Sequence, residues 1–108
     1  MSPSTTDSFV SIVGTYQVDP QDTAAFANIA AHSVLATVNK PGCLYYTASQ
    51  DLAQANVFHL AEGWATQADL DAHLASRDFN DMLEQALKLR ILDREIHVSQ
   101  SHGRVLMS

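Results

Sequence analysis

The sequence predicts an α+β domain of the ferredoxin-like type, with a four-stranded antiparallel sheet and its helices on one face. The first observation behind this is the order of the segments: β-branched and aromatic stretches alternate with alanine- and leucine-rich stretches as β-α-β-β-α-β. The second is size, because 108 residues of which 46% are hydrophobic suit one folded domain. We expect a single domain over residues 1–108, with residues 1–7 and 103–108 as flexible or partner-contacting tails.

The first part of the chain contains a strand, a helix and a turn. Phe9–Val18 is rich in β-branched and aromatic residues and is expected to be a strand, with Gly14 marking a bulge or a close approach. Asp19 and Pro20 end this strand and open a helix over Gln21–Val38. The expected buried stripe of the helix is Ala27, Ala31, Val34, Leu35 and Val38, widened by Phe26 and Ile29.

Two strands, a helical region in two parts and a last strand complete the pattern. Cys43–Gln50 and Val57–Ala65 are expected to form a hairpin joined by a polar loop. Thr66 is expected to cap one helix and Ser76 a second. The second carries an apolar face of Phe79, Met82, Leu83, Ala86 and Leu87, and Ile91–Ser99 is the last strand.

Apolar side chains occur on both faces of the predicted strands. Simple alternation places Leu44 and Tyr46 on one face and Cys43 and Tyr45 on the other. Helices can cover only one face of such a sheet, so the second face needs another partner. We therefore expect a homodimer that packs sheet on sheet.

Charge excludes several classes of partner. The net charge is -6, and one basic residue, Lys40, stands against seven acidic ones between Met1 and Ser76. No basic stripe is available for nucleic acid or for an anionic membrane surface. No apolar run approaches the roughly 20 residues of a membrane helix, and the first residues lack the pattern of a secretory signal. The expected location is cytoplasmic, and the expected partners are a small molecule and a second copy of the chain.

Three short motifs stand out in the sequence: PGCLYY at 41–46, EGW at 62–64 and ADLDAHLAS at 68–76 with Phe79 after it. Together they resemble the motifs of the antibiotic biosynthesis monooxygenase family. Members of that family carry a PG turn before the second strand, E-x-W at the end of the third and a helical A-L-x-x-H-L-x-S-x-x-F. The resemblance covers nearly the whole chain, and it implies a dimeric α+β barrel with one pocket per subunit between sheet and helices.

The resemblance also bears on activity. Members include cofactor-independent oxygenases of quinols or aromatic polyketides, and haem-degrading enzymes. Gly14, His73 and Leu83 stand where haem-degrading members carry Asn, Trp and His, which disfavours haem degradation. Leu60 replaces an Asn of the polyketide-oxidising members, and Asp78 replaces the second His of many quinol-type members.

Two residues are candidates for a catalytic base. Oxygenation without a metal or flavin needs an electron-rich substrate, a group that removes its proton and an apolar site that excludes water. The ordinary pKa of histidine, about 6.5, makes His73 the first candidate, with Asp69 one turn earlier to orient it. Glu62 is the second, because an apolar setting would raise its pKa. The alternative is that His73 is an inert helix residue and that Glu62 only supports the structure.

Four residues are candidates for substrate binding. Trp64 could form a stacking wall, and Tyr46 and Tyr16 could donate their hydroxyls to a quinone-like oxygen. Arg77 could stabilise a phenolate. Each also has a purely structural interpretation, as core packing for the aromatic residues and as a solvated charge for Arg77.

Neither a metal nor another cofactor is expected. No pair among His32, His59, His97 and His102 has the i,i+4 or i,i+2 spacing of metal ligands, and the lone Cys43 is expected to be a buried thiol. The sequence therefore predicts a cofactor-independent monooxygenase that acts on a small aromatic, phenolic or quinol substrate with dioxygen. Two alternatives stay open, an isomerase or lyase of a small carbonyl compound and a non-enzymatic binding module. A cavity lined by His73 and Trp64 would favour an enzyme.

Overall fold

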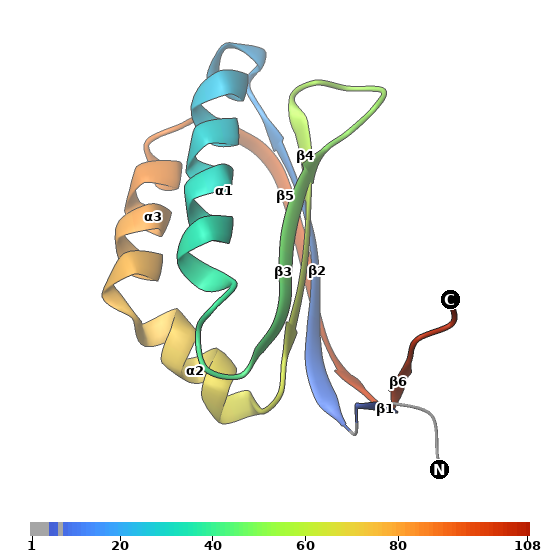
Figure 1. Cartoon of the computed structure of the whole chain (residues 1–108). Coiled ribbons are helices and arrows are strands. Elements are labelled where there is room, and N and C mark those ends of the chain that lie inside the picture. Colours follow the sequence, from blue (N-terminus) through green and yellow to red (C-terminus); the bar gives the residue numbers. More distant parts are fainter. Residues whose placement is uncertain (1–4, 7) are drawn as a thin grey trace.

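The structure is a computed structural model that describes residues 5–6 and 8–108. It has the predicted α+β architecture, with a four-stranded antiparallel sheet and helices packed on it (Figure 1). Residues 1–4 and 7 of the predicted N-terminal tail lie outside the described residues. The elements in chain order are β1 (Thr5–Thr6), β2 (Phe9–Val18), a short 3-10 helix (Pro20–Asp22), α1 (Thr23–Thr37), β3 (Cys43–Gln50), β4 (Val57–Trp64), α2 (Gln67–Ala75), α3 (Arg77–Leu87), β5 (Ile91–Ser101) and β6 (Arg104–Val105).

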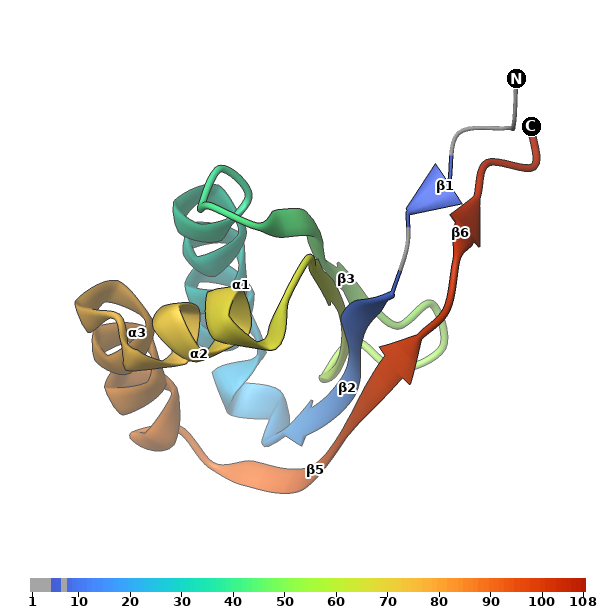
Figure 2. The ribbon, with the colours of Figure 1, turned by 90° about the horizontal axis from the view of Figure 1, so that it is seen from below.

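The sheet has the strand order β3-β4-β2-β5, with every neighbouring pair antiparallel. All three helices lie on one face of it, and the opposite face carries no helix (Figure 2). The two ends of the described chain meet in a separate two-stranded sheet, in which β1 pairs with β6. Part of the predicted C-terminal tail therefore forms a strand.

Short polar side chains set the helix boundaries. The carboxylate of Asp19 accepts a hydrogen bond from the backbone N–H of Gln21 at 2.9 Å and starts the 3-10 turn that precedes α1. Thr66 caps α2 by accepting from the Asp69 N–H at 3.1 Å, as predicted. Ser76 ends α2 and also caps α3, so one residue separates the two helices and turns the chain between them.

The buried face of α1 differs from the predicted stripe. The buried residues are Phe26, Ser33 and Thr37, while Leu35 is 75% exposed and Ala31 is also exposed. Ser33 can be buried because its hydroxyl is hydrogen-bonded to that of Tyr46 at 2.9 Å. The prediction was right for Phe26, Ala27 and Val34, which belong to or pack against the core clusters. It was wrong for Ala31, Leu35 and Val38, which are exposed, because it counted only apolar residues on an alanine-rich helix.

A bulge at the start of β3 changes the predicted alternation. Cys43 pairs with Trp64 but Tyr45 pairs with Gly63, so two steps along β3 match one step along β4. The extra residue places Cys43 on the helix side with Trp64, and Tyr46 is also on that side. The predicted assignment of Cys43 and Tyr45 to one face was therefore wrong.

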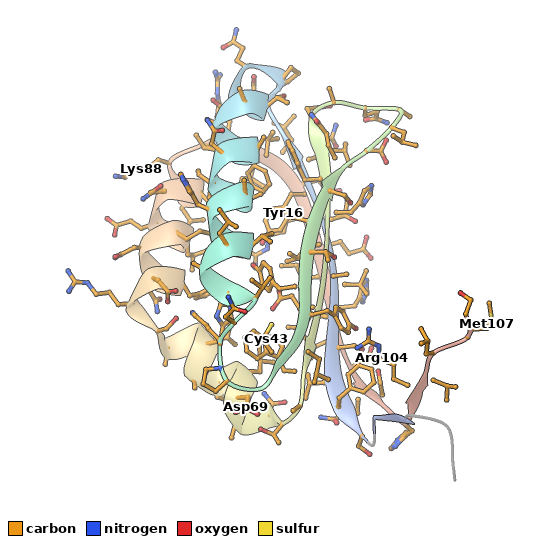
Figure 3. The ribbon with its side chains drawn as sticks, viewed as in Figure 1. Tyr16, Cys43, Asp69, Lys88, Arg104 and Met107 are labelled. Carbon is orange, nitrogen blue, oxygen red and sulfur yellow. The ribbon has the colours of Figure 1, made fainter. Side chains whose placement is uncertain are left out.

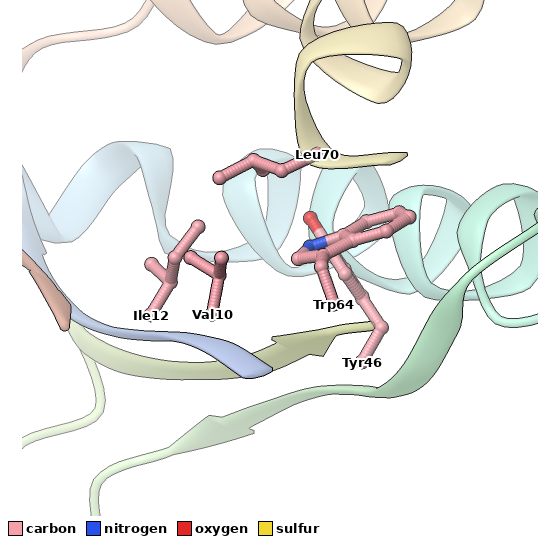
Figure 4. Packing of buried hydrophobic residues seen from close by; sticks show 5 residues of the cluster. All are labelled: Val10, Ile12, Tyr46, Trp64 and Leu70. Carbon is pink, nitrogen blue, oxygen red and sulfur yellow. The ribbon is translucent and has the colours of Figure 1, made fainter. Parts of the chain in front are cut away.

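The core consists of two clusters between the sheet and the helices. The first packs Trp64 and Tyr46 from the sheet against Leu70 of α2 (Figure 4), together with Val10 and Ile12. The second contains Val18, Phe26 and Phe58. The fully buried Trp64 is the largest side chain of the first cluster. Among the helices of the described residues, none is long and apolar enough to cross a membrane.

Candidate active site

A cavity of about 240 Å³ lies between the inner face of the sheet and the helices. Its wall is mostly apolar, and the strand β5 forms its outer side, where Ile96 and Val98 are still 37% and 60% exposed. The cavity thus opens beside β5. The lining residues are Ile12, Tyr16, Phe26, Ile29, Ala30, Ser33, Tyr46, Ala48, Phe58, His59, Leu60, Glu62, Leu70, Leu74, Phe79, Met82, Leu83, Ala86, Leu87, Ile91, Arg94, Ile96 and Val98.

The wall of the cavity includes a buried carboxyl group, that of Glu62. Glu62 is 6% exposed, and its Oε1 accepts a hydrogen bond from the indole Nε1–H of Trp64 at 3.0 Å. Burial raises the pKa of Glu62 above its ordinary value, although the indole hydrogen bond acts in the opposite direction. The carboxyl is therefore a stronger base when ionised than an exposed glutamate.

Two tyrosine hydroxyls lie near this carboxyl. Tyr46 is directly opposite Glu62 on the neighbouring strand, and burial raises the pKa of Tyr46 to about 12. Tyr46 consequently remains a hydrogen-bond donor at neutral pH. Tyr16 lines the same cavity from β2 (Figure 3), where burial also raises its pKa, and the Arg94 guanidinium lies 6.0 Å from the centre of its ring.

His73 lies behind the wall of the cavity and not on it. Its ring stacks on Trp64 with 4.8 Å between ring centres and meets Phe79 edge-on at 4.9 Å. The ammonium group of Lys40 donates to its Nδ1 at 3.0 Å, which leaves the ring neutral with its proton on Nε2. Burial and the nearby Lys40 charge lower the pKa of His73 to about 4.

Lys40 ties this histidine to the junction of α2 and α3. Besides His73, its Nζ donates to the hydroxyl of Ser76 at 3.0 Å and to the carboxylate of Asp78 at 2.8 Å. The hydrogen bond from Lys40 lowers the pKa of Asp78 to about 2. Asp78 thus takes part in an ion pair that fixes the helix junction.

The structure separates the predicted site residues into three groups. Glu62, Tyr46 and Tyr16 line the cavity together. Trp64 and His73 are buried one layer behind it, so the cavity is present but neither of these two residues lines it. Arg77 lies away from it, with a 95% exposed side chain 3.8 Å from Asp81. Asp69 does not orient His73, since its carboxylate accepts from Thr66 at 2.8 Å.

Sequence reasoning missed three polar residues of the cavity, Ser33, His59 and Arg94. Alternation along β5 could have found Arg94, because it places this residue on the same face as Ile96 and Val98. Ser33 follows Phe26 by seven residues, two helical turns, and so shares its face of α1.

Two further positions singled out in the sequence, Gly14 and Leu60, lie at or beside the cavity. A Cβ atom at Gly14 would come within 3.3 Å of Cγ1 of Ile96, so the predicted close approach is confirmed, between β2 and the side chain of β5. Leu60 lines the cavity and adds an apolar side chain to its wall. Within the part of the chain that the structure describes, no three His, Cys, Asp or Glu side chains form a possible metal site.

The fold and the cavity define an α+β domain that encloses an apolar pocket between an antiparallel sheet and its helices. Comparison with protein families matches residues 9–85 to the model of the antibiotic biosynthesis monooxygenase domain. The chain belongs to this family.

Solved structures support the same fold. A candidate antibiotic biosynthesis monooxygenase from Deinococcus radiodurans is 24% identical, with a TM-score of 0.83 over 92% of this chain and 98% of that one. A conserved protein from Methanosarcina mazei is 22% identical, with a TM-score of 0.78 over 87% of this chain and 92% of that one. An uncharacterised protein of Synechocystis is 25% identical over 85% of this chain, and the matched region spans 63% of that relative's length.

The pKa of His73 gives a testable dependence of stability on pH. A histidine in the unfolded chain has a pKa near 6.5, whereas the pKa of His73 in the folded chain is about 4. Between these values protons bind the unfolded chain preferentially, so the free energy of unfolding falls as the pH is lowered from about 6.5 to about 4. We expect His73→Gln, which can still accept from Lys40, to remove this part of the slope in urea unfolding. His32→Gln, at an exposed position of α1, should keep it; equal slopes in the two variants would contradict the assignment.

Proposed function

We propose that this chain is a monooxygenase that oxidises a small electron-rich aromatic, a phenol or hydroquinone, with dioxygen and without a cofactor. The observation that carries the proposal is the buried carboxyl of Glu62 at an apolar cavity that Tyr46 and Tyr16 also line. A base, two donors and an apolar, aromatic-lined wall are what such a reaction requires of the protein. Family membership supports the same reaction class.

In this proposal Glu62 removes the phenolic proton. Of the two candidate bases, Glu62 lines the cavity and His73 does not. The raised pKa of Glu62 strengthens it as a base. The indole N–H of Trp64 donates a hydrogen bond to Oε1 of Glu62 and so holds the carboxyl group in place. Tyr46, with a pKa of about 12, stays protonated and donates a hydrogen bond to the phenolate as charge develops.

The phenolate then reduces dioxygen itself. One electron passes to dioxygen, and the resulting superoxide and phenoxyl radical combine at a ring carbon to form a peroxide. Loss of the hydrogen from that carbon and cleavage of the O–O bond leave a quinone and one water. One oxygen atom stays on the ring, the other leaves as water, and all four electrons come from the substrate.

Oxygen uptake tests this proposal. Purified, metal-stripped protein is mixed with a panel of hydroquinones and polycyclic phenols under labelled dioxygen. We expect uptake above the spontaneous rate, with one labelled atom in the product and one in water. Protein-dependent proton exchange on these substrates without uptake would instead favour the isomerase or lyase alternative, and an absence of both would favour a binding module.

We propose further that two copies of the chain pair through the helix-free face of the sheet. Val13, on this face of β2, is 60% exposed, and Ala61 is its neighbour on β4. We expect Val13→Asp to convert a particle with the mass of two chains to one with the mass of one in light scattering. Leu35→Asp, at an even more exposed position on the helix side, is the matched control and should stay dimeric. A wild-type chain that is monomeric at micromolar concentration would contradict the pairing.

A further inference from the structure

Arg94 is the arginine that lines the cavity, and within the part of the chain that the structure describes no carboxylate forms an ion pair with its guanidinium. Among the described residues, Lys40, Arg77 and Arg90 each lie within 4.0 Å of a carboxylate, and Arg94 does not. The neighbouring Asp93 carboxylate accepts from the backbone N–H of Arg94 at 2.9 Å rather than from its guanidinium. The guanidinium instead lies 6.0 Å from the ring centre of Tyr16.

This placement leaves the donors of Arg94 available at the open side of the cavity. Arg94 is exposed, and the β5 residues that follow it on the same face, Ile96 and Val98, form the accessible edge of the apolar wall. A guanidinium offers five N–H donors in a planar fork that matches a carboxylate. The chain as a whole carries a charge of -6, so a bound anion gains attraction only at such a local cation.

The sheet register gives the distance between Arg94 and the proposed base. Glu62 pairs with Ile12 and Ile12 with Val98, so Arg94 lies four residues along and two strands across from Glu62. Strand geometry makes these offsets about 13 Å and about 10 Å, which puts the two backbone positions about 16 Å apart. Both residues line the cavity from the inner face of the sheet. A backbone separation of this size is long enough for a ligand of one or two aromatic rings to lie between two side chains.

We propose that Arg94 forms an anion subsite at the mouth of the cavity, and that the substrate is an aromatic hydroxy acid. Its carboxylate pairs with Arg94, its ring lies against the apolar wall, and its hydroxyl points to Glu62. The role of Glu62 rests on the function proposed above, but the pairing with Arg94 does not. Arg94 then determines specificity, because it favours the acid over the neutral phenol with the same ring.

Binding of two matched probes tests the subsite. Calorimetry under anaerobic conditions compares a naphthol with the hydroxynaphthoate that carries its carboxylate on the other ring. We expect wild-type protein to bind the acid about tenfold more tightly than the neutral probe, with a preference that shrinks as salt is added. Arg94→Met should remove the preference by weakening the acid alone, and Arg94→Lys should keep part of it.

Arg77→Met is the matched control, since Arg77 is an exposed arginine away from the cavity, and it should leave both affinities unchanged. Equal weakening of the two probes in Arg94→Met, or no binding of the acid at millimolar concentration, would overturn the subsite. Oxygen uptake is measured separately on the hydroquinone carboxylate. Arg94-dependent binding without uptake would support the subsite and contradict only the monooxygenase proposal.

Discussion

Replacing Glu62 with Gln is expected to lower the turnover of the oxygen-uptake reaction by about 10²- to 10⁴-fold, the contribution typical of a positioned general base. The amide cannot accept the phenolic proton at neutral pH. Its carbonyl oxygen can still accept the hydrogen bond that the indole of Trp64 donates to Oε1 of Glu62 at 3.0 Å. The fold and the cavity shape should therefore survive, and the loss should appear in kcat/KM at unchanged stability.

The pH profile gives this prediction a second readout. Glu62 acts as a base only when ionised, so wild-type kcat/KM should fall as the pH is lowered through its pKa, which burial raises. The residual activity of Glu62→Gln should not show this fall in kcat/KM at low pH. Glu84→Gln on the exposed side of α3 serves as the control for a lost surface carboxylate. Wild-type turnover in Glu62→Gln would remove Glu62 from the mechanism.

Gly42→Ala is expected to cost about 3 kcal/mol of unfolding free energy, the sum of two effects. Gly42 has a φ of +76°, where an L side chain is strained. An added Cβ would also lie 2.6 Å from the Cβ of Asp69 and closer still to its carboxylate, so the start of α2 must move. The carbonyl of Gly42 accepts from the N–H of Ala65 at 2.8 Å, which ties the turn to the end of β4.

Gly103→Ala separates the two effects. Gly103 has a similar φ of +72°, but an added Cβ there would meet nothing within 4 Å. We expect the free energy of unfolding of this variant to fall by about 1 kcal/mol or less, because only the backbone strain at a positive φ applies there. Urea midpoints of the two variants measure the difference. Equal losses would show that Asp69 moves aside freely and that the close packing of α2 on the turn contributes nothing.

Element order and helix caps could be predicted because they depend on local chemistry. Thr66 and Ser76 cap their helices whatever packs on them, and the β-branched content of Phe9–Val18 requires no distant partner. The α1 face could not be predicted in the same way. Leu35 is more hydrophobic than Ser33, yet Ser33 is buried because Tyr46, thirteen residues later, supplies its hydrogen bond.

The site was predictable where strand alternation controlled it. Tyr16, Tyr46 and Glu62 lie on inward positions of three adjacent strands, and the structure brings them to one cavity. His73 was misplaced relative to the cavity because its position depends on Trp64 beneath it and on Lys40, which is distant in sequence. Arg77 was chosen for its nearness to the helical motif, and Arg94 was not considered, although an exposed first-turn residue has no need to face the core.

Trp64 is the single tryptophan of the chain, fully buried, bonded to the cavity carboxyl and stacked on the ring of His73. Its fluorescence is therefore an intrinsic reporter of the site. Any ligand that changes the ionisation of Glu62 alters the charge at the indole N–H, and with it the intensity and wavelength of emission. Occupancy can be followed without a label and without turnover, and the buried ring should emit at short wavelength until the domain unfolds.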